Sequence, residues 1–287
     1  MTSYFGLYCA PRGWKHQLVW QVSETRYARS KLGACGVTEY PMTEATLEAQ
    51  IAVEARGEEY SLVPHQLGPA RRHPRINRGE CVLLDDREAV ALQHGTVATS
   101  ILIDRLRRVF DHVEPDPKNG RVWGHVIREL LILAATEFET AAASVLRANG
   151  VPERRFSTID YVRLLDPMHL DGRGARLALY PAWPLVRPFE GWSAENPTAS
   201  LRWYDAYNRV KHDRERNFHL ATLEAAIHAT VAAVLMLVAQ FGRGKCEPIL
   251  NEIEPELGRP FAAHEHYYPH GDPNVWELVP AFAPEAG

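Results

Sequence analysis

The chain has 287 residues, of which 46% are hydrophobic and 24% are charged. These fractions are close to the average of globular proteins and exclude a wholly disordered chain. The formal net charge of −4 argues against a uniformly basic nucleic-acid-binding protein, although it leaves room for a local basic patch. The length suits one large domain or two small ones.

The cysteines and the hydropathy pattern point to a reducing compartment. The four cysteines, Cys9, Cys35, Cys81 and Cys246, are scattered, and we expect free thiols rather than disulfides or a zinc site. No signal peptide is visible at the N-terminus. The most apolar segment, 220–241, is interrupted by polar residues, which is typical of a buried core helix rather than a membrane span. We therefore expect a cytoplasmic protein without membrane contact.

The pattern of residues 1–95 predicts a small α/β or irregular extension. Apolar and polar residues alternate weakly, and short helical periodicity is confined to one stretch. The elements expected here are a strand around 18–22, a helix over 43–56 with Leu47 and Ile51 on one side, an exposed basic loop over 65–79 and a short strand over 80–86.

Residues 96–242 predict a mostly α domain, a helical bundle. Apolar residues recur with the 3.6-residue period of a helix, and Gly150 and Gly242 follow two of the periodic runs. An insertion rich in proline and aromatic residues, 151–199, interrupts the bundle, and we expect its aromatic residues to pack onto the helices. The tail 243–287 is rich in proline and has no periodic run. The helices expected are 96–113, 122–149, one from Leu201 onward and 219–241.

The clearest functional signal lies in the helix that starts near Leu201. Between residues 202 and 216 there are five basic and three acidic residues, which is a local excess of positive charge in an acidic chain. At 100° per residue, one face carries Trp203, Tyr207 and Val210 toward the core. The opposite face is expected to carry Tyr204, Asn208, Lys211 and His212.

This combination of residues suits the handling of a phosphodiester. A histidine such as His212 transfers protons near neutral pH, and Asn208, one helical turn away, could orient it or the phosphate. Lys211 and Arg209 would stabilise phosphate charge. We predict His212, Asn208 and Lys211 as catalytic residues and Arg209, Tyr204 and Arg214 as substrate-binding residues.

The segment Tyr207-Asn208-Arg209-Val210-Lys211-His212 resembles the motif of the HEPN superfamily, an Arg, then often Asn, Asp or His, and a His after a few residues. The resemblance covers residues 96–242, and Tyr207 stands at the position of the motif's Arg. It implies a four- or five-helix up-and-down bundle that dimerises. It also implies a cleft between the two motifs in which active members cut RNA without a metal or other cofactor.

The resemblance favours a metal-independent endoribonuclease, for example a toxin or an antiphage defence effector. The alternative is a catalytically inactive HEPN-like module that binds RNA, a nucleotide or a partner protein such as an antitoxin or a defence-system component. We also expect a homodimer through the motif-side face, because helix 219–241 is apolar almost all round and one flank would need a second copy to cover it.

Two further features are weaker. His264, His266 and His270 have a spacing that could bind a metal, but the chain has 13 histidines and chance clusters are common, so no metal is expected. Glu137 lies among apolar residues, where Lys211 or His212 could neutralise it, although a solvated face or an interhelical salt bridge is the simpler interpretation. NTPase, dinucleotide-oxidoreductase and α/β-hydrolase motifs are absent from the sequence.

Overall fold

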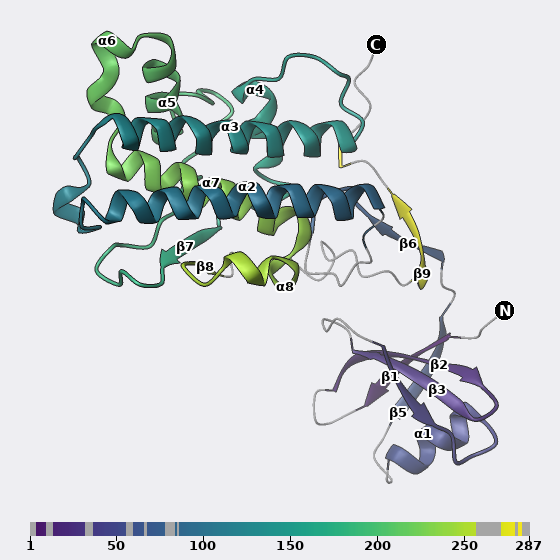
Figure 1. Ribbon diagram of the computed structural model, residues 1–287. Helices are drawn as coiled ribbons and strands as arrows, with labels where there is room; N and C mark the ends of the chain where they lie inside the picture. Colours follow the sequence, from purple (N-terminus) through teal and green to yellow (C-terminus); the bar gives the residue numbers. More distant parts are fainter. Residues whose placement is uncertain are drawn as a thin grey trace. The chain divides into compact units, whose positions relative to one another are not determined.

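The computed structural model describes residues 4–9, 14–31, 37–55, 60–65, 68–77, 84, 86–256, 271–278 and 281–282 (Figure 1). The chain divides into two compact units. The N-terminal unit comprises residues 1–72, 79–83 and 263–279, and the helical unit comprises residues 73–78, 84–262 and 280–287. Helices make up most of the regular structure, which confirms the mostly α class.

The N-terminal unit is a five-stranded antiparallel sheet with one helix. The strand order is β4-β3-β2-β1-β5, and a separate parallel pair joins β6 to β9. The helix packs through Leu47 and Ile51 onto Val19 and Tyr27 of the sheet. The elements are β1 (Tyr4–Cys9), β2 (Trp14–Ser23), β3 (Arg26–Lys31), β4 (Val37–Pro41), α1 (Leu47–Ala55), β5 (Tyr60–His65), β6 (Gly68–Arg72) and β9 (Gly271–Leu278).

This unit is therefore α+β with an antiparallel sheet, rather than α/β or irregular. The strand expected around 18–22 lies inside β2, but the buried residue Val19 belongs to the opposite phase of the alternation. The segment expected to be an exposed basic loop instead contains β6, and it continues into Pro74 and Ile76, which are buried in the helical unit. Of the strand expected at 80–86, residues 80–83 and 85 lie outside the described residues.

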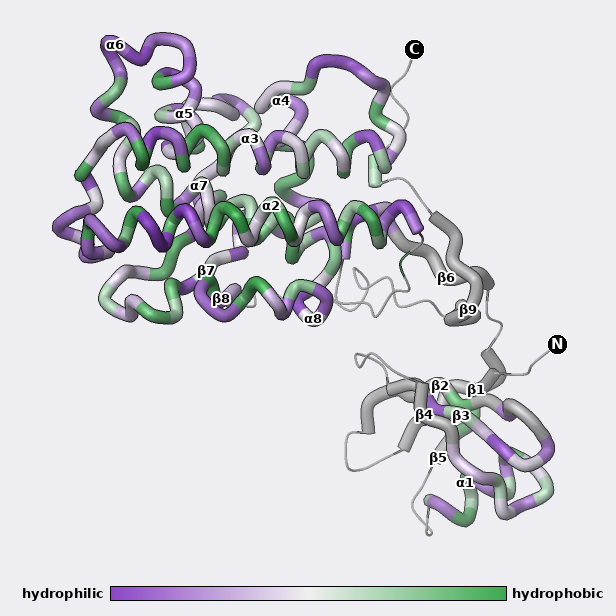
Figure 2. Tube along the Cα trace, in the orientation of Figure 1, coloured by the Kyte–Doolittle hydropathy of each residue, from purple (hydrophilic) through white to green (hydrophobic). Residues whose placement is uncertain are grey.

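Four helices form the framework of the helical unit: α2 (Asp86–Phe110), α3 (His125–Ala148), α5 (Arg202–His212) and α7 (Leu223–Phe241). Helix α7 contacts the other three, and α2 and α3 run side by side (Figure 1). Hydrophobic and hydrophilic residues alternate along α2, as an amphipathic surface helix requires (Figure 2). Helix α2 begins ten residues before the expected start at Thr96.

Helix α7 is the centre of the core. All of its residues except Glu224 and His228 are buried within the chain. Among the described helices it is the one long and apolar enough to cross a membrane, but 89% of its apolar window is covered by the protein itself. The prediction of a core helix is thus confirmed. The flank that was expected to need a second copy is already covered.

The insertion and residues 243–256 of the tail form ordered elements of the helical unit, whereas β9 of the tail belongs to the N-terminal unit. Of the insertion's six aromatic residues, five are buried as expected: Phe156, Tyr161, Trp183, Phe189 and Trp192. The sixth, Tyr180, is half-buried and packs edge-on against Phe110 of α2. The tail contributes a strand that pairs with one from the insertion, so it is not irregular. The remaining elements are η1 (Pro117–Asn119), α4 (Thr158–Tyr161), η2 (Val162–Leu164), β7 (Gly174–Leu177), α6 (Arg214–Asn217), η3 (Phe218–Leu220), α8 (Arg243–Cys246), η4 (Glu247–Ile249) and β8 (Ile253–Glu256).

Candidate functional site

Helix α5 carries the motif and is anchored by its inner face. It spans Arg202–His212 and ends at Asp213, whose side chain accepts a hydrogen bond from the Arg216 N–H and so caps α6. The expected core residues Trp203, Tyr207 and Val210 are buried. Tyr204 is buried too, which corrects the expectation that it lies on the outer face.

Tyr204 is buried because its hydroxyl has a partner on α3. It donates a hydrogen bond to Glu139 Oε1 at 2.5 Å, and the Tyr207 hydroxyl donates to Glu139 Oε2 at 3.3 Å. Lys211 Nζ in turn donates to the Tyr207 hydroxyl at 2.7 Å. One carboxylate and one ammonium group therefore enclose two buried phenols, and this four-residue network fixes α5 against α3.

The network also sets the protonation of its members. Burial and the hydrogen bond to Glu139 raise the pKa of Tyr204 far above its usual range, so this phenol stays neutral. Tyr161 lies outside the network, but burial and the nearby Glu139 carboxylate raise its pKa to about 12. The hydrogen bond to Tyr207 is the main cause that raises the pKa of Lys211, and Lys211 is charged at neutral pH.

The outer face of α5 presents the other predicted site residues. His212 is exposed and Asn208 is half-buried, and the predicted residue Arg214 is exposed at the start of α6. Arg209 Nε lies 2.9 Å from Asp205 Oδ2 in an exposed i, i+4 ion pair. Within the described part of the chain no hydrogen bond joins Asn208 to His212, although they lie on successive turns. The residues of α6 (Arg214–Asn217) are hydrophilic, as Figure 2 shows, and none of them is buried.

Glu137 does not contact α5, the helix that carries the motif. It lies two residues before Glu139, which is about 200° around α3, and it lines a cavity with residues of α2 and α7. The acidic partner of Lys211 and the two tyrosines is Glu139 instead. The sequence gives both glutamates similar surroundings, and only the packing of α5 distinguishes them.

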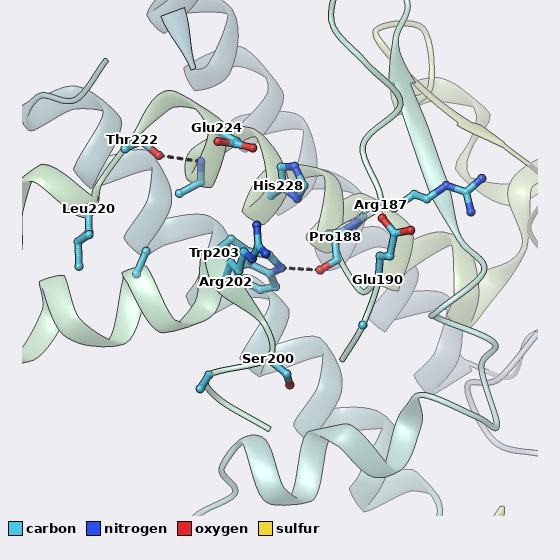
Figure 3. A pocket seen from close by; sticks show the side chains of 14 residues that line it. Arg187, Pro188, Glu190, Ser200, Arg202, Trp203, Leu220, Thr222, Glu224 and His228 are labelled. Atoms are coloured by element: carbon cyan, nitrogen blue, oxygen red, sulfur yellow. Dashed lines mark hydrogen bonds between the residues drawn. The ribbon is translucent and has the colours of Figure 1, made fainter. Parts of the chain in front are cut away.

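A cleft of about 770 Å³ lies beside the first turns of α5 (Figure 3). Arg202, Trp203 and Ala206 line one side, and Glu224 and His228 of α7 line another. Figure 3 shows Arg202 and His228 among the side chains that line this cleft, with Glu190 on the loop that precedes α5. The Trp203 indole is fixed by donating to the Pro188 carbonyl at 2.8 Å.

The sequence interpretation missed this cleft. Glu190 comes from the insertion and His228 from the middle of an apolar helix, and neither has a neighbour in the sequence that marks it as part of a site. The i, i+4 spacing of Glu224 and His228, the two residues of α7 that are not buried, is the one pattern that could have indicated a polar stripe on this helix.

The cleft makes stability depend on pH. Burial lowers the pKa of His228, while the nearby carboxylates of Glu224 and Glu190 act in the opposite direction. His228 is therefore protonated in the unfolded chain at a higher pH than in the folded protein. As the pH falls below the ordinary histidine pKa of about 6.5, proton binding favours the unfolded chain and the folded state loses stability. We expect His228→Gln to lose less stability than the wild type between about pH 7.5 and about pH 5.5 in urea unfolding. Equal losses in both proteins would contradict this assignment.

Among the described residues, no group of three His, Cys, Asp or Glu side chains is placed to hold a metal ion. The predicted cluster of His264, His266 and His270 lies outside the described residues. Of the cysteines, Cys246 is a buried free thiol, and burial raises its pKa to about 12, so it is unreactive at neutral pH.

The comparisons with known proteins give no relative: no family model matches the chain, and neither a curated protein nor a solved structure is similar to it.

Proposed function

We propose that the protein is a metal-independent endoribonuclease of the HEPN type, with its active groups on the outer face of α5. His212 accepts the proton of the attacking hydroxyl as a general base or donates a proton to the leaving oxygen as a general acid, and Asn208 orients the phosphate. Lys211, with Arg209 and Arg214, binds phosphate charge. Tyr204, predicted to bind substrate, instead anchors the helix.

The observation that best supports this proposal is the anchoring of α5. The Glu139–Tyr204–Tyr207–Lys211 network holds the inner face of the helix, while His212 is exposed one turn beyond Asn208. A catalytic group needs a rigid support to act on a substrate in one geometry, and a helix packed on a bundle supplies it. Arg209 is paired with Asp205 and Lys211 donates to the Tyr207 hydroxyl, so Arg214 is the better phosphate contact.

A second function is favoured by Tyr207. This residue occupies the position of the motif's Arg, yet only 1% of it is exposed and its hydroxyl is engaged by Glu139 and Lys211. The position therefore has a structural use here. The corresponding function is a catalytically inactive module that binds RNA, a nucleotide or a partner protein through the same outer face.

We expect purified protein to cleave single-stranded RNA in the presence of EDTA, and His212→Ala to lower the cleavage rate at least about 100-fold, as general acid–base groups typically contribute. The matched control is His219→Ala, because His219 is also exposed and lies seven residues further along the chain. Cleavage is followed on a fluorescently labelled oligonucleotide, with both variants purified in the same way.

A measurement of RNA binding by the purified protein separates the ribonuclease from the inactive binding module. If wild type leaves RNA intact but binds it, and if Arg214→Glu weakens this binding, the inactive module is supported. Cleavage that His212→Ala leaves unchanged would come from elsewhere and would refute the proposed catalytic role.

The assembly and the partners belong to the same proposal. A homodimer would bring two α5 helices together, and an antitoxin or a defence-system protein would control the activity in the cytoplasm. Since α7 needs no second copy to cover it, the dimer depends on the family resemblance alone. Light scattering tests it, because a mass of 32.4 kDa at all concentrations would identify a monomer.

A further inference from the structure

A group of aromatic side chains reaches the surface where α3 begins and where α6 leads into η3. Trp123, two residues before α3, is 50% exposed, and its ring lies edge-on against Phe218 with 5.0 Å between the centroids. The exposed His125, in the first turn of α3, has its ring centroid 4.7 Å from that of the half-buried Phe218. Figure 1 shows α6 at the end of the helical unit where α3 begins. Together the three rings form an aromatic platform.

The backbone holds this platform in place. Trp123 forms an antiparallel bridge with Thr222, and the Leu223 N–H donates a hydrogen bond to the Val122 carbonyl at 2.8 Å. These contacts attach the segment before α3 to the start of α7, the most buried helix of the core. A ring on such a support keeps one orientation toward a ligand.

The exposure of Trp123 is unusual because tryptophan is highly buried on average in folded proteins. Val122 and Val126, before and after it in the chain, are 39% and 55% exposed. Apolar and aromatic surface is therefore continued along this segment rather than confined to one residue. Exposed apolar surface of this kind typically marks a site of interaction.

The charge of the surrounding segments is positive. Residues 116–128 and 209–222, which carry the platform, contain seven Lys or Arg and three Asp or Glu residues, in a chain of net charge −4. Two of the seven cations are paired with a nearby aspartate. Lys118, Arg121 and Arg214 are exposed, and among the described residues none forms an ion pair with them. This surface therefore attracts a polyanion.

A ligand that matches both features must combine flat rings with negative charges at short intervals. Single-stranded RNA does so, because its unpaired bases stack on aromatic side chains while its phosphates contact lysine and arginine. Double-stranded RNA offers the same charge, but its bases are already paired and stacked inside the helix. The platform thus favours the single strand over the duplex.

We propose that the aromatic platform binds an unpaired base of single-stranded RNA, stacked on Trp123, while Arg214 contacts the phosphates. Phe218 lies six residues beyond His212, so the chain limits the separation of their Cα atoms to about 22 Å. A strand held at the platform can therefore extend onto the outer face of α5. This inference rests on the proposed binding of RNA, and it names the form that is bound, but it does not require cleavage.

Fluorescence anisotropy with labelled RNA tests the proposal on the full chain carrying His212→Ala, which lacks the proposed catalytic group. The three ligands are a single strand, a strand of the same length from which every base has been removed, and the corresponding duplex. The strand without bases keeps all phosphates. We expect it to bind at least about 5-fold more weakly than the intact strand, the smallest effect typical of one lost stacking contact. The duplex should bind no better than the strand without bases.

Variants of this chain locate the stacking contact. Trp123→Ala should weaken binding of the single strand at least about 5-fold without changing its dependence on salt, because stacking releases no counterions. Arg214→Glu should weaken binding and reduce that dependence. Trp123→Phe keeps an aromatic ring and should restore most of the affinity. Leu133→Ala, at an exposed apolar position of α3, should change nothing, and thermal unfolding checks that each variant is folded.

The proposal fails if the duplex or the strand without bases binds as tightly as the intact strand, or if no single strand binds up to about 1 mM. It also fails if Trp123→Ala binds RNA as well as its parent, which would leave a protein partner as the occupant of the platform. His212-dependent cleavage together with that last result would refute the platform and keep the nuclease. Binding that depends on Trp123 in a protein that does not cleave RNA would do the reverse.

Discussion

Replacing Phe138 by alanine is expected to lower the free energy of unfolding of the helical unit by about 3–5 kcal/mol, the range for a large aromatic residue removed from a core. Phe138 lies on α3 and is fully buried. It connects α3 both to the insertion and to the motif helix, so its loss leaves a cavity between three parts of the unit. The rings that surround it, with centroids within 6.2 Å, are Tyr161, Phe189, Trp192, Trp203 and Tyr204.

Urea unfolding followed by tryptophan fluorescence measures this loss, because Trp192 and Trp203 belong to the same cluster. Leu133→Ala is the matched control, since Leu133 is an exposed apolar residue on the same helix and should change stability by less than about 0.5 kcal/mol. A loss below about 1 kcal/mol for Phe138→Ala would show that the insertion is not packed on α3 as described.

The helices could be predicted because a helix that packs on a core repeats its apolar residues every 3.6 positions. This periodicity located α3 to within a few residues and placed Trp203, Tyr207 and Val210 on the buried face of α5. The end of α3 was equally clear, since Gly150 adopts a φ of 82°, which glycine accepts at the end of a helix without steric cost.

The pairing of distant strands could not be predicted. Strand β7 of the insertion pairs with β8 of the tail, so that Arg176 lies opposite Glu254, and neither segment shows a periodic pattern. The early start of α2 was missed for a related reason. Half of its first ten residues are polar or charged, and the one that is buried among them is Glu88, so this part of the helix lacks the apolar period.

Of the candidate site, the sequence could predict only the residues on the outer face of α5. A helical projection separates inner from outer residues by hydropathy, and tyrosine is ambiguous on that scale because it has an apolar ring and a polar hydroxyl. Tyr204 is buried because Glu139, 65 residues away in the sequence, accepts its hydrogen bond. Two Tyr residues on one helix and a Glu on another become a network only after the helices pack.

Glu137 and Glu139 give the sharpest test of that network, because the same substitution at two positions of one helix should change stability in opposite directions. Glu139 accepts hydrogen bonds from two buried phenols. In Glu139→Gln an N–H₂ group replaces one of the acceptor oxygens, so one phenol loses its acceptor. We expect a loss of about 1–3 kcal/mol in the free energy of unfolding, the cost of a buried polar group without a partner.

Glu137→Gln should instead raise the free energy of unfolding at pH 7. Burial raises the pKa of Glu137 in the folded protein, so the ionised carboxylate is disfavoured there relative to the unfolded chain, and a neutral amide removes that cost. As the pH falls through the folded pKa toward the ordinary value of about 4.3, the wild-type carboxyl becomes protonated and the advantage of the variant disappears.

Urea unfolding of wild type and both variants at about pH 7 and about pH 4.5 measures both effects in one series. The unfolded states of the two variants are nearly identical in composition, so a difference between them reports the folded environments of the two side chains. If Glu139→Gln is as stable as the wild type, the network does not anchor α5, and the rigid support for His212 is lost with it. If Glu137→Gln is destabilised at pH 7, the folded protein stabilises the Glu137 carboxylate through a partner, and burial does not dominate its pKa.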